Sequence, residues 1–252
     1  MNAAPSTSKL AGPSLQRKSI PVGVILLIAA VVSLFLWLFP GAGIVLLPLR
    51  PFVTFVHETW HAAVALLTGG HVRAIAIQGF SGNGDTLTAG GNPLLIASAG
   101  YVGSALTGAI FLAVLRRPAV ARVLSVVVFL ALAVTTVLWD HAIFAWLYLL
   151  AVGLGLYGLV RLASDWVFTL IVGFFALQLN LQVLTDLRDL VLLSVGKTPT
   201  DAALAGQLTH TAPLLWALLW TVISLTLLGI GLRIASVNPH RTKPRDHPAG
   251  AT

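Results

Sequence analysis

The chain has 252 residues, of which 57% are hydrophobic and 9% are charged, and its mean hydropathy is +0.93. Soluble domains are roughly one quarter charged and disordered chains are poor in apolar residues, so this composition excludes both classes and indicates a membrane protein. The formal net charge is +7. Because Lys and Arg lie mainly near the two ends and in short connections between apolar segments, we expect contact with anionic lipid and no nucleic acid partner.

About seven apolar segments follow one another, and each is about as long as a helix that crosses a bilayer. Backbone groups in hydrocarbon must be paired within a segment, so these segments predict helices. They run over residues 20–39, 51–68, 93–115, 120–138, 142–160, 166–193 and 213–232. We therefore expect an all-α membrane fold, in which residues 20–235 form a polytopic helical bundle of about seven transmembrane segments. Residues 1–19 and 236–252 are expected to be disordered tails.

The loop over residues 69–92 has a different pattern. It contains seven Gly, and Val72, Ala74 and Ala76 alternate along it as in a β-strand. The segment Ser81 to Asp85 is rich in turn-forming residues. We expect a small membrane-associated β-hairpin in this loop.

Counting the crossings produces a conflict. If the chain starts on the cytoplasmic side and every apolar segment crosses, the hairpin lies inside and the connection between the third and fourth segments lies outside. The positive-inside rule opposes this arrangement, because Arg116, Arg117 and Arg122 form a dense basic cluster there. Either one segment does not cross fully or the rule is broken, and the absolute orientation stays open.

The second apolar segment contains His57-Glu58-Thr59-Trp60-His61, an H-E-x-x-H sequence. On a helix, positions i and i+4 lie about 40° apart and one turn up, so both imidazoles can reach one metal ion. Glu58 lies about 100° away, where it can act on a water molecule instead of binding the metal. Two His and one carboxylate form a Zn²⁺ site with a position left open for water.

The third ligand must come from elsewhere, because the chain has no Cys and no further His or acid at a suitable spacing. His61 lies about seven residues, or roughly 10 Å, from the hairpin end of its segment. Counting alternate crossings excludes Asp165 and brings the end of the sixth segment to the hairpin side. Asp186 lies there at the matching depth, so we predict Asp186 as the ligand, with Asp189 and Asp140 as alternatives.

These features together give the chain a resemblance to the site-2 protease group of intramembrane zinc metalloproteases, most closely to its M50B-like branch found in bacteria. The resemblance covers residues 51–216. It implies that His57 and His61 bind zinc, that Glu58 is the catalytic glutamate, and that the hairpin guides substrates. The segment Gly100-Tyr101-Val102-Gly103 falls where small residues let the next helix approach the metal. The implied location is a bacterial cell membrane, crossed several times.

The second motif of that family has an Asn, a Pro and then Asp-Gly. Here Asn180 precedes Asp186, but the Pro is missing and Leu187 replaces the Gly. On a regular helix Asn180 lies about 120° from Asp186, whereas Gln182 shares its face. Asn180 and Gln182 are both candidate substrate-binding residues, and we predict that Gln182 supports Asp186 or the substrate carbonyl.

A polar segment follows the sixth apolar stretch, from Lys197 to Ala203. It is typical of a loop that leads into a helix, with Thr200 or Asp201 as the N-cap. Contact of Asp201 with substrate is conceivable, but nothing in the sequence requires it.

The function these observations favour is an intramembrane zinc metalloprotease that hydrolyses peptide bonds of membrane-protein substrates, with Glu58 as general base and acid. Its partners are the lipid bilayer and a substrate segment that becomes extended by pairing with the hairpin edge. The alternative is a non-proteolytic membrane protein, either a metal transporter or an inactive protease-like scaffold. The intact Glu58 argues against a scaffold, which would tolerate Gln or Ala at that position.

Overall fold

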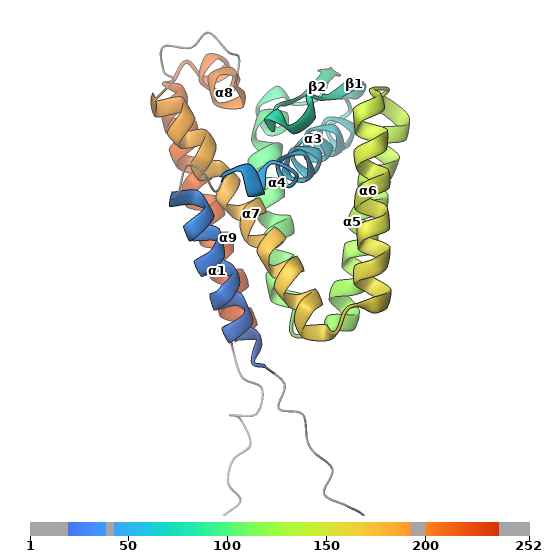
Figure 1. The fold of residues 1–252 in the computed structure, drawn as a ribbon. Coiled ribbons are helices and arrows are strands. Elements are labelled where there is room, and N and C mark those ends of the chain that lie inside the picture. Colours follow the sequence, from blue (N-terminus) through green and yellow to red (C-terminus); the bar gives the residue numbers. More distant parts are fainter. Residues whose placement is uncertain (1–19, 39–42, 193–199, 237–252) are drawn as a thin grey trace, which may run out of the picture.

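The apolar segments of the sequence form helices in the computed structural model, and a small sheet covers one end of them (Figure 1). The structure describes residues 20–38, 43–192 and 200–236, without the side chains of 37, 38, 43, 45 and 185–192. The elements are α1 (Val22–Leu38), α2 (Gly43–Leu46), α3 (Arg50–Leu67), β1 (His71–Ile77), η2 (Gly79–Ser81), β2 (Gly84–Ala89), α4 (Pro93–Val114), α5 (Pro118–Trp139), α6 (Ile143–Leu162), α7 (Asp165–Leu192), α8 (Asp201–Thr209) and α9 (Pro213–Ser236). The expected tails lie outside the described residues, except for Ser236.

Within the described residues, five helices are long and apolar enough to cross a membrane. They are α4, α5, α6, α7 over Asp165–Leu184, and α9. The helix α1 is apolar but shorter, and α3 is not among the five. A helical membrane protein with a small hairpin is therefore confirmed, whereas the count of about seven spans is not.

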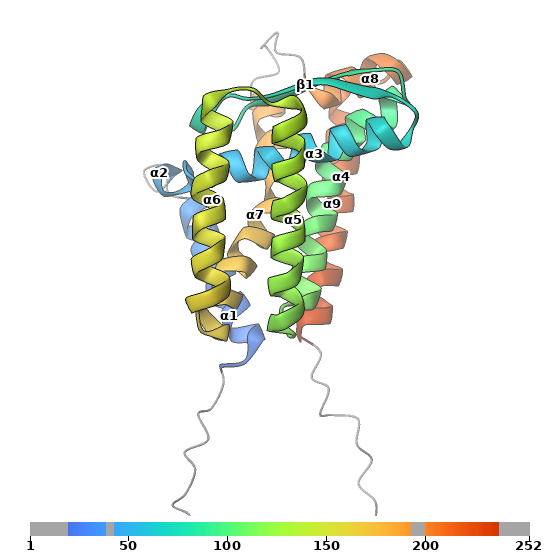
Figure 2. The ribbon, with the colours of Figure 1, turned by 90° about the vertical axis from the view of Figure 1, so that its right-hand side faces the viewer.

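The direction of α3 explains why it adds no crossing. Figure 2 shows α3 running across the bundle, whereas α4, α5, α6 and α9 run along its length. Its sequence contains Arg50, Glu58 and two His, so it is less apolar than the helices that span. Its buried face includes Phe55, Glu58 and His61.

A helix that does not cross removes the topological conflict in the sequence. One end of the bundle contains the start of α1, the end of α9, and the connections between α4 and α5 and between α6 and α7 (Figures 1 and 2). We call it the basic end. The hairpin and α8 lie at the other end, the hairpin end. Eleven of the fifteen Lys and Arg residues lie at the basic end or in the sequence that precedes α1 or follows α9: Lys9, Arg17, Lys18, Arg116, Arg117, Arg122, Arg161, Arg233, Arg241, Lys243 and Arg245.

Arg122 connects three helices at the basic end. Its guanidinium donates to the backbone oxygens of Leu159 and Ala163, and lies 2.9 Å from Asp165 Oδ1. It also lies 4.6 Å from the centroid of the Phe168 ring. Asp165 therefore belongs to the end opposite the hairpin, as the sequence predicts.

The predicted hairpin is present, with β1 and β2 antiparallel and paired from His71 opposite Ala89 to Ile77 opposite Gly84. Ile75 and Ile77 are buried, because this face of β1 packs on α3 and α5. At the end of β1, the backbone N–H of Ile77 donates to Asp140 Oδ2 at 3.3 Å. The C-terminus of α5 thus covers the end of β1 at Ile77.

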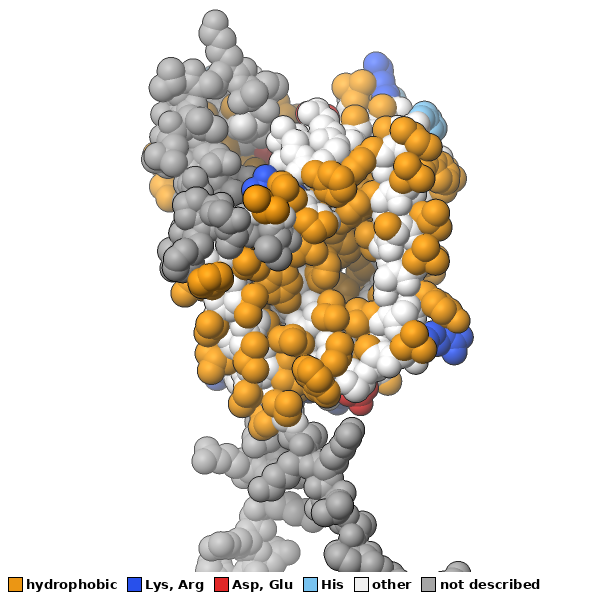
Figure 3. Space-filling view, viewed as in Figure 1, with side chains coloured by type: hydrophobic (Ala, Val, Ile, Leu, Met, Phe, Trp, Pro, Cys, Tyr) orange, Lys and Arg blue, Asp and Glu red, His pale blue; other side chains and the backbone are white. Residues whose placement is uncertain are grey.

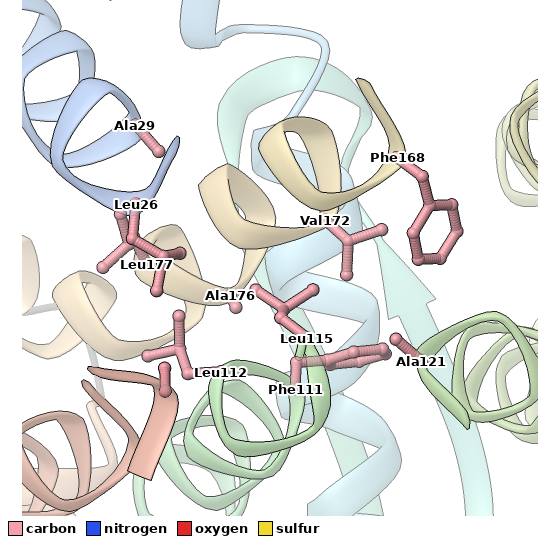
Figure 4. Close-up of a cluster of buried hydrophobic side chains, with 11 residues drawn as sticks. Leu26, Ala29, Phe111, Leu112, Leu115, Ala121, Phe168, Val172, Ala176 and Leu177 are labelled. Carbon is pink, nitrogen blue, oxygen red and sulfur yellow. The ribbon is translucent and has the colours of Figure 1, made fainter. Parts of the chain in front are cut away.

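Apolar packing holds the helices together. Figure 4 shows the cluster in which side chains of α1, α4 and α7 meet, among them Leu26, Leu112 and Phe168. The surface of the spans is also largely hydrophobic, as expected for lipid contact (Figure 3). Between α5, α6 and α7 lies a cavity of about 280 Å³, lined by apolar residues such as Phe129 and Phe175.

The distribution of basic residues predicts that the basic end is cytoplasmic and the hairpin end faces away from the cytoplasm. Because the chain has no Cys, single cysteines report on their own position. In intact cells, a membrane-impermeant maleimide should label Asn83→Cys, on the exposed hairpin, and should leave Ala119→Cys unlabelled until the membrane is opened. Leu147→Cys, exposed on the apolar surface of α6, is the control that stays unlabelled. The reverse pattern would contradict this orientation, and labelling of both sites from one side would contradict the fold.

Candidate metal centre

His57 and His61 lie one turn apart on α3, and the centroids of their rings are 4.7 Å apart. His61 is 5% exposed and His57 is partly buried. The i, i+4 spacing thus brings the two imidazoles to the same side of the helix, as the sequence predicts.

A carboxylate from a distant part of the chain meets both imidazoles. Asp201 Oδ2 lies 3.1 Å from His57 Nε2 and 3.4 Å from His61 Nε2. One ligand atom from each of the three residues lies within 4.8 Å of the others. In the part of the chain that the structure describes, His57, His61 and Asp201 form the group of His, Asp and Glu side chains that could hold a metal ion.

The separations between these atoms fit a tetrahedral zinc site. Metal–ligand bonds of about 2.0–2.2 Å at tetrahedral angles place the ligand atoms roughly 3.3–3.6 Å apart. In addition, His61 Nδ1 lies 2.6 Å from the backbone oxygen of Ile96 on α4. Donation of the Nδ1 proton to this oxygen leaves the lone pair on Nε2, which is the usual arrangement of a metal-binding histidine. The three donor types and the two separations from Asp201 Oδ2 therefore fit a zinc ion.

The position of Asp201 is fixed by α8, of which it is the first residue. Thr200 caps this helix, since its hydroxyl oxygen accepts the backbone N–H of Ala203 at 3.1 Å. The small residues Ala202 and Ala205 are buried in a cluster with Trp220 of α9, which holds α8 against α4 and α9. The prediction that Thr200 or Asp201 caps a helix is confirmed for Thr200.

A glycine lets α4 approach the histidines. A Cβ atom on Gly100 would overlap the ring of His57, including Nε2. The next residue, Tyr101, packs edge-on against His57 with 4.7 Å between ring centroids. One turn along α3, a Cβ on Gly103 would overlap the Trp60 indole. The small residues between 100 and 103 thus allow the close approach of the next helix that the resemblance implies.

The charges around the site favour a cation. Burial by itself lowers the pKa of His61, but the charge and hydrogen bond of Asp201 and the charge of Glu58 together raise it to about 9. Burial by itself raises the pKa of Asp201, yet the two histidines hold it well below its usual range. The negative charges of Asp201 and Glu58 stabilise a positive charge at this position, which either a proton on His61 or a divalent cation between neutral imidazoles would supply.

Glu58 lies beside the cluster, and it is 5% exposed. Its carboxylate accepts a hydrogen bond of 2.7 Å from the Thr86 hydroxyl of β2. The hairpin therefore covers the one glutamate of the chain. Its negative charge acts on His61, whose pKa it helps to raise.

Of the three acids that the sequence offers as the third ligand, the structure describes the side chain of Asp140 alone. The side chains of Asp186 and Asp189 lie outside the described residues, and the carboxylate that the structure brings to the histidines is Asp201. Asp186 is predicted from the depth of His61 in the membrane, and that depth assumes that α3 crosses the membrane. Because α3 is not among the helices long and apolar enough to cross, the depth no longer supports Asp186. Asp140 is 1% exposed and accepts the N–H groups of Ile77 and Ala142, so its role is structural.

The two candidate substrate-binding residues lie on α7. Asn180 is fully buried, donates its amide to the backbone oxygen of Ala176 at 2.9 Å, and packs against Gly108. Gly108 is eight residues, or about 12 Å of helix, beyond Gly100 on α4, so Asn180 is not among the residues around the histidines. Gln182 is partly buried. Their contact with substrate stays a prediction.

One signal in the sequence could have indicated Asp201. The second motif of the family that the chain resembles has a Pro and then Asp-Gly, and a similar order, with Ala202 in place of the Gly, occurs in Pro199-Thr200-Asp201-Ala202. The segment lies outside every apolar stretch, so a search limited to acids within the membrane passes over it.

The bundle with an H-E-x-x-H helix and a His, His, Asp cluster defines the class: an integral membrane protein with a candidate metal centre. The profile of the Peptidase M50B-like family matches residues 25–231, and the chain belongs to that family of peptidases. No curated protein and no solved structure matches the chain.

The close approach of α4 predicts that Gly100→Ala displaces His57 and weakens metal binding. Overpacking of this kind costs about 1–3 kcal/mol of stability. Gly155→Ala on α6 is the matched control, because a Cβ there meets nothing within 4 Å. The two purified variants are compared by metal content and by thermal unfolding. Gly100→Ala should bind less metal and unfold at a lower temperature than the parent, whereas Gly155→Ala should match the parent. Equal metal retention would contradict the tight contact.

Proposed function

We propose that this protein is an intramembrane zinc metalloprotease that cleaves peptide bonds of membrane-protein substrates. The observation that carries the proposal is the meeting of His57 Nε2, His61 Nε2 and Asp201 Oδ2 at ligand-to-ligand separations. Membership of a peptidase family supports it. Among the described residues three candidate ligands meet, and a site with three protein ligands leaves a position for water, as in catalytic zinc sites.

In the proposed reaction, His57, His61 and Asp201 hold the zinc ion. When bound there, zinc supplies Lewis acidity, which lowers the pKa of a water molecule and polarises the scissile carbonyl. Glu58 accepts the proton of the attacking water and passes it to the leaving amine, so no net proton is consumed. The hydrogen bond from His61 Nδ1 to Ile96 keeps the ring oriented toward the ion during this cycle.

We further propose that the substrate pairs with the outer edge of β2. The end of β1 is covered by Asp140 of α5, whereas β2 is the strand whose Thr86 contacts Glu58. Addition of an extended segment to a sheet edge provides backbone hydrogen bonds for a peptide that has left its helix. An extended peptide at this edge lies beside the proton acceptor.

The identity of the third ligand can be tested by two Asp→Asn variants. Asp201→Asn should lose stoichiometric zinc, because an amide oxygen is a much weaker ligand than a carboxylate. Asp186→Asn should retain it. Elemental analysis of both purified variants beside the parent makes the comparison. Zinc loss in Asp186→Asn alone would return the role to Asp186.

The role of Glu58 predicts that Glu58→Gln keeps its zinc but loses cleavage. Removing a general base typically reduces the rate about 10²–10⁴-fold. The measurement is cleavage of a reconstituted membrane-protein segment by the parent and by the variant, with zinc content determined on the same samples. Zinc flux into vesicles without a cut product would instead identify a transporter, and full cleavage by Glu58→Gln would exclude this mechanism.

A further inference from the structure

The carboxylate of Glu58 is held by the hairpin. Thr86 on β2 places its hydroxyl oxygen 2.7 Å from Glu58 Oε2 and 3.3 Å from the Glu58 backbone oxygen. A hydroxyl has one proton, and the shorter contact has the length expected for a bond to a charged carboxylate, so the proton is directed to Oε2. Within the described part of the chain, no other side chain donates a hydrogen bond to this carboxylate.

A second hydroxyl fixes β2 relative to α3. Thr54, one turn before Glu58, donates to the backbone oxygen of Gly82 at 2.9 Å in the turn that leads into β2. Gly84, the first residue of β2, lies so close to Glu58 that a Cβ there would be 2.9 Å from Oε1. The strand therefore lies directly on the helix at Glu58, and a shift of the strand would move the carboxylate.

We propose that Thr86 is a positioning residue, which orients Glu58 for proton transfer. The inference rests on the proposed function, in which Glu58 is the general base. A glutamate side chain has several rotatable bonds, and the hydrogen bond to Oε2 selects one orientation of the carboxylate. Misplacement of a reacting group by about 1 Å costs roughly 10²-fold in rate, so this bond affects turnover although Thr86 contacts no metal ligand directly.

The first test compares three variants: one without the hydroxyl of residue 86, one that keeps it, and one with the same change at another position. Thr86→Val removes the hydroxyl and keeps the shape, and Thr86→Ser keeps the hydroxyl. Thr226→Val is the control, since it makes the same change at an exposed position of α9, outside the hairpin and the candidate metal centre. We expect Thr86→Val to lower kcat about 10–100-fold with KM and zinc content unchanged. Thr86→Ser should restore most of the rate, and Thr226→Val should match the parent.

A double-variant comparison separates positioning of Glu58 from a general effect on the strand. In the Glu58→Gln background, Thr86→Val should lower the residual rate no further, because the two residues act as one unit. An additive loss, or a Thr86→Ser variant as slow as Thr86→Val, would show that Thr86 acts only on the structure of the strand and would overturn the inference.

A spectroscopic measurement makes the inference independent of proteolysis. Glu58 is the one Glu in the chain, so protein made with carboxyl-¹³C glutamate gives a glutamate carboxyl resonance from this residue alone. Thr86→Val should shift that resonance, whereas Thr86→Ser and Thr226→Val should leave it near the parent value. If the resonance shifts but the parent cuts no substrate, the contact holds and the proposed function fails. If the resonance of Thr86→Val equals that of the parent, the inference is overturned whatever the activity.

Discussion

The helix α4 is the common support of the candidate metal centre. It contacts α3, which carries both histidines, and α8, which carries Asp201. Gly100 allows the ring of His57 to lie against the α4 backbone, and Ile96 accepts the hydrogen bond of His61. The three ligands come from two elements that are far apart in sequence, so their separations are set by the distance of each element from α4. A change in α4 packing therefore alters the centre even where no ligand is changed.

The two ends of the bundle differ in their electrostatics. At the basic end, Arg122 satisfies helix-terminal carbonyls and pairs with Asp165, while exposed residues such as Arg117 and Arg161 are available to lipid headgroups. At the hairpin end, the candidate ligands and Glu58 are partly or fully buried and lie close to one another, whereas Arg73 and Asp85 of the hairpin are exposed. The residues available to lipid headgroups and the candidate metal centre thus lie at opposite ends of the bundle, separated by the length of the spanning helices.

Local patterns in the sequence predict much of this structure. The boundaries of the apolar helices, the hairpin and the pairing of His57 with His61 depend on periodicity and turn chemistry over a few residues. The direction of α3 is not local, because a segment of the right length and apolarity can lie across a bundle once neighbouring helices bury its polar face. Asp201 lies 144 residues from His57, and its approach depends on the packing of α8 against α4 and α9. Counting α3 as a crossing helix therefore directs the search for the third ligand to α7, whereas the carboxylate that the structure brings to the histidines lies on α8.

The depth of the histidines limits which bonds of a membrane segment are within reach. His57 lies beside Gly100, seven residues or about 10 Å from the start of α4 at the hairpin end. In hydrocarbon, each backbone group that leaves its helix unpaired costs several kcal/mol. In the proposed reaction, a substrate helix that enters from this end has to unwind about two turns before a peptide bond reaches the zinc ligands. Bonds near the midplane of a stable helix would stay out of reach, so susceptibility depends on how easily the last turns of a substrate helix unwind.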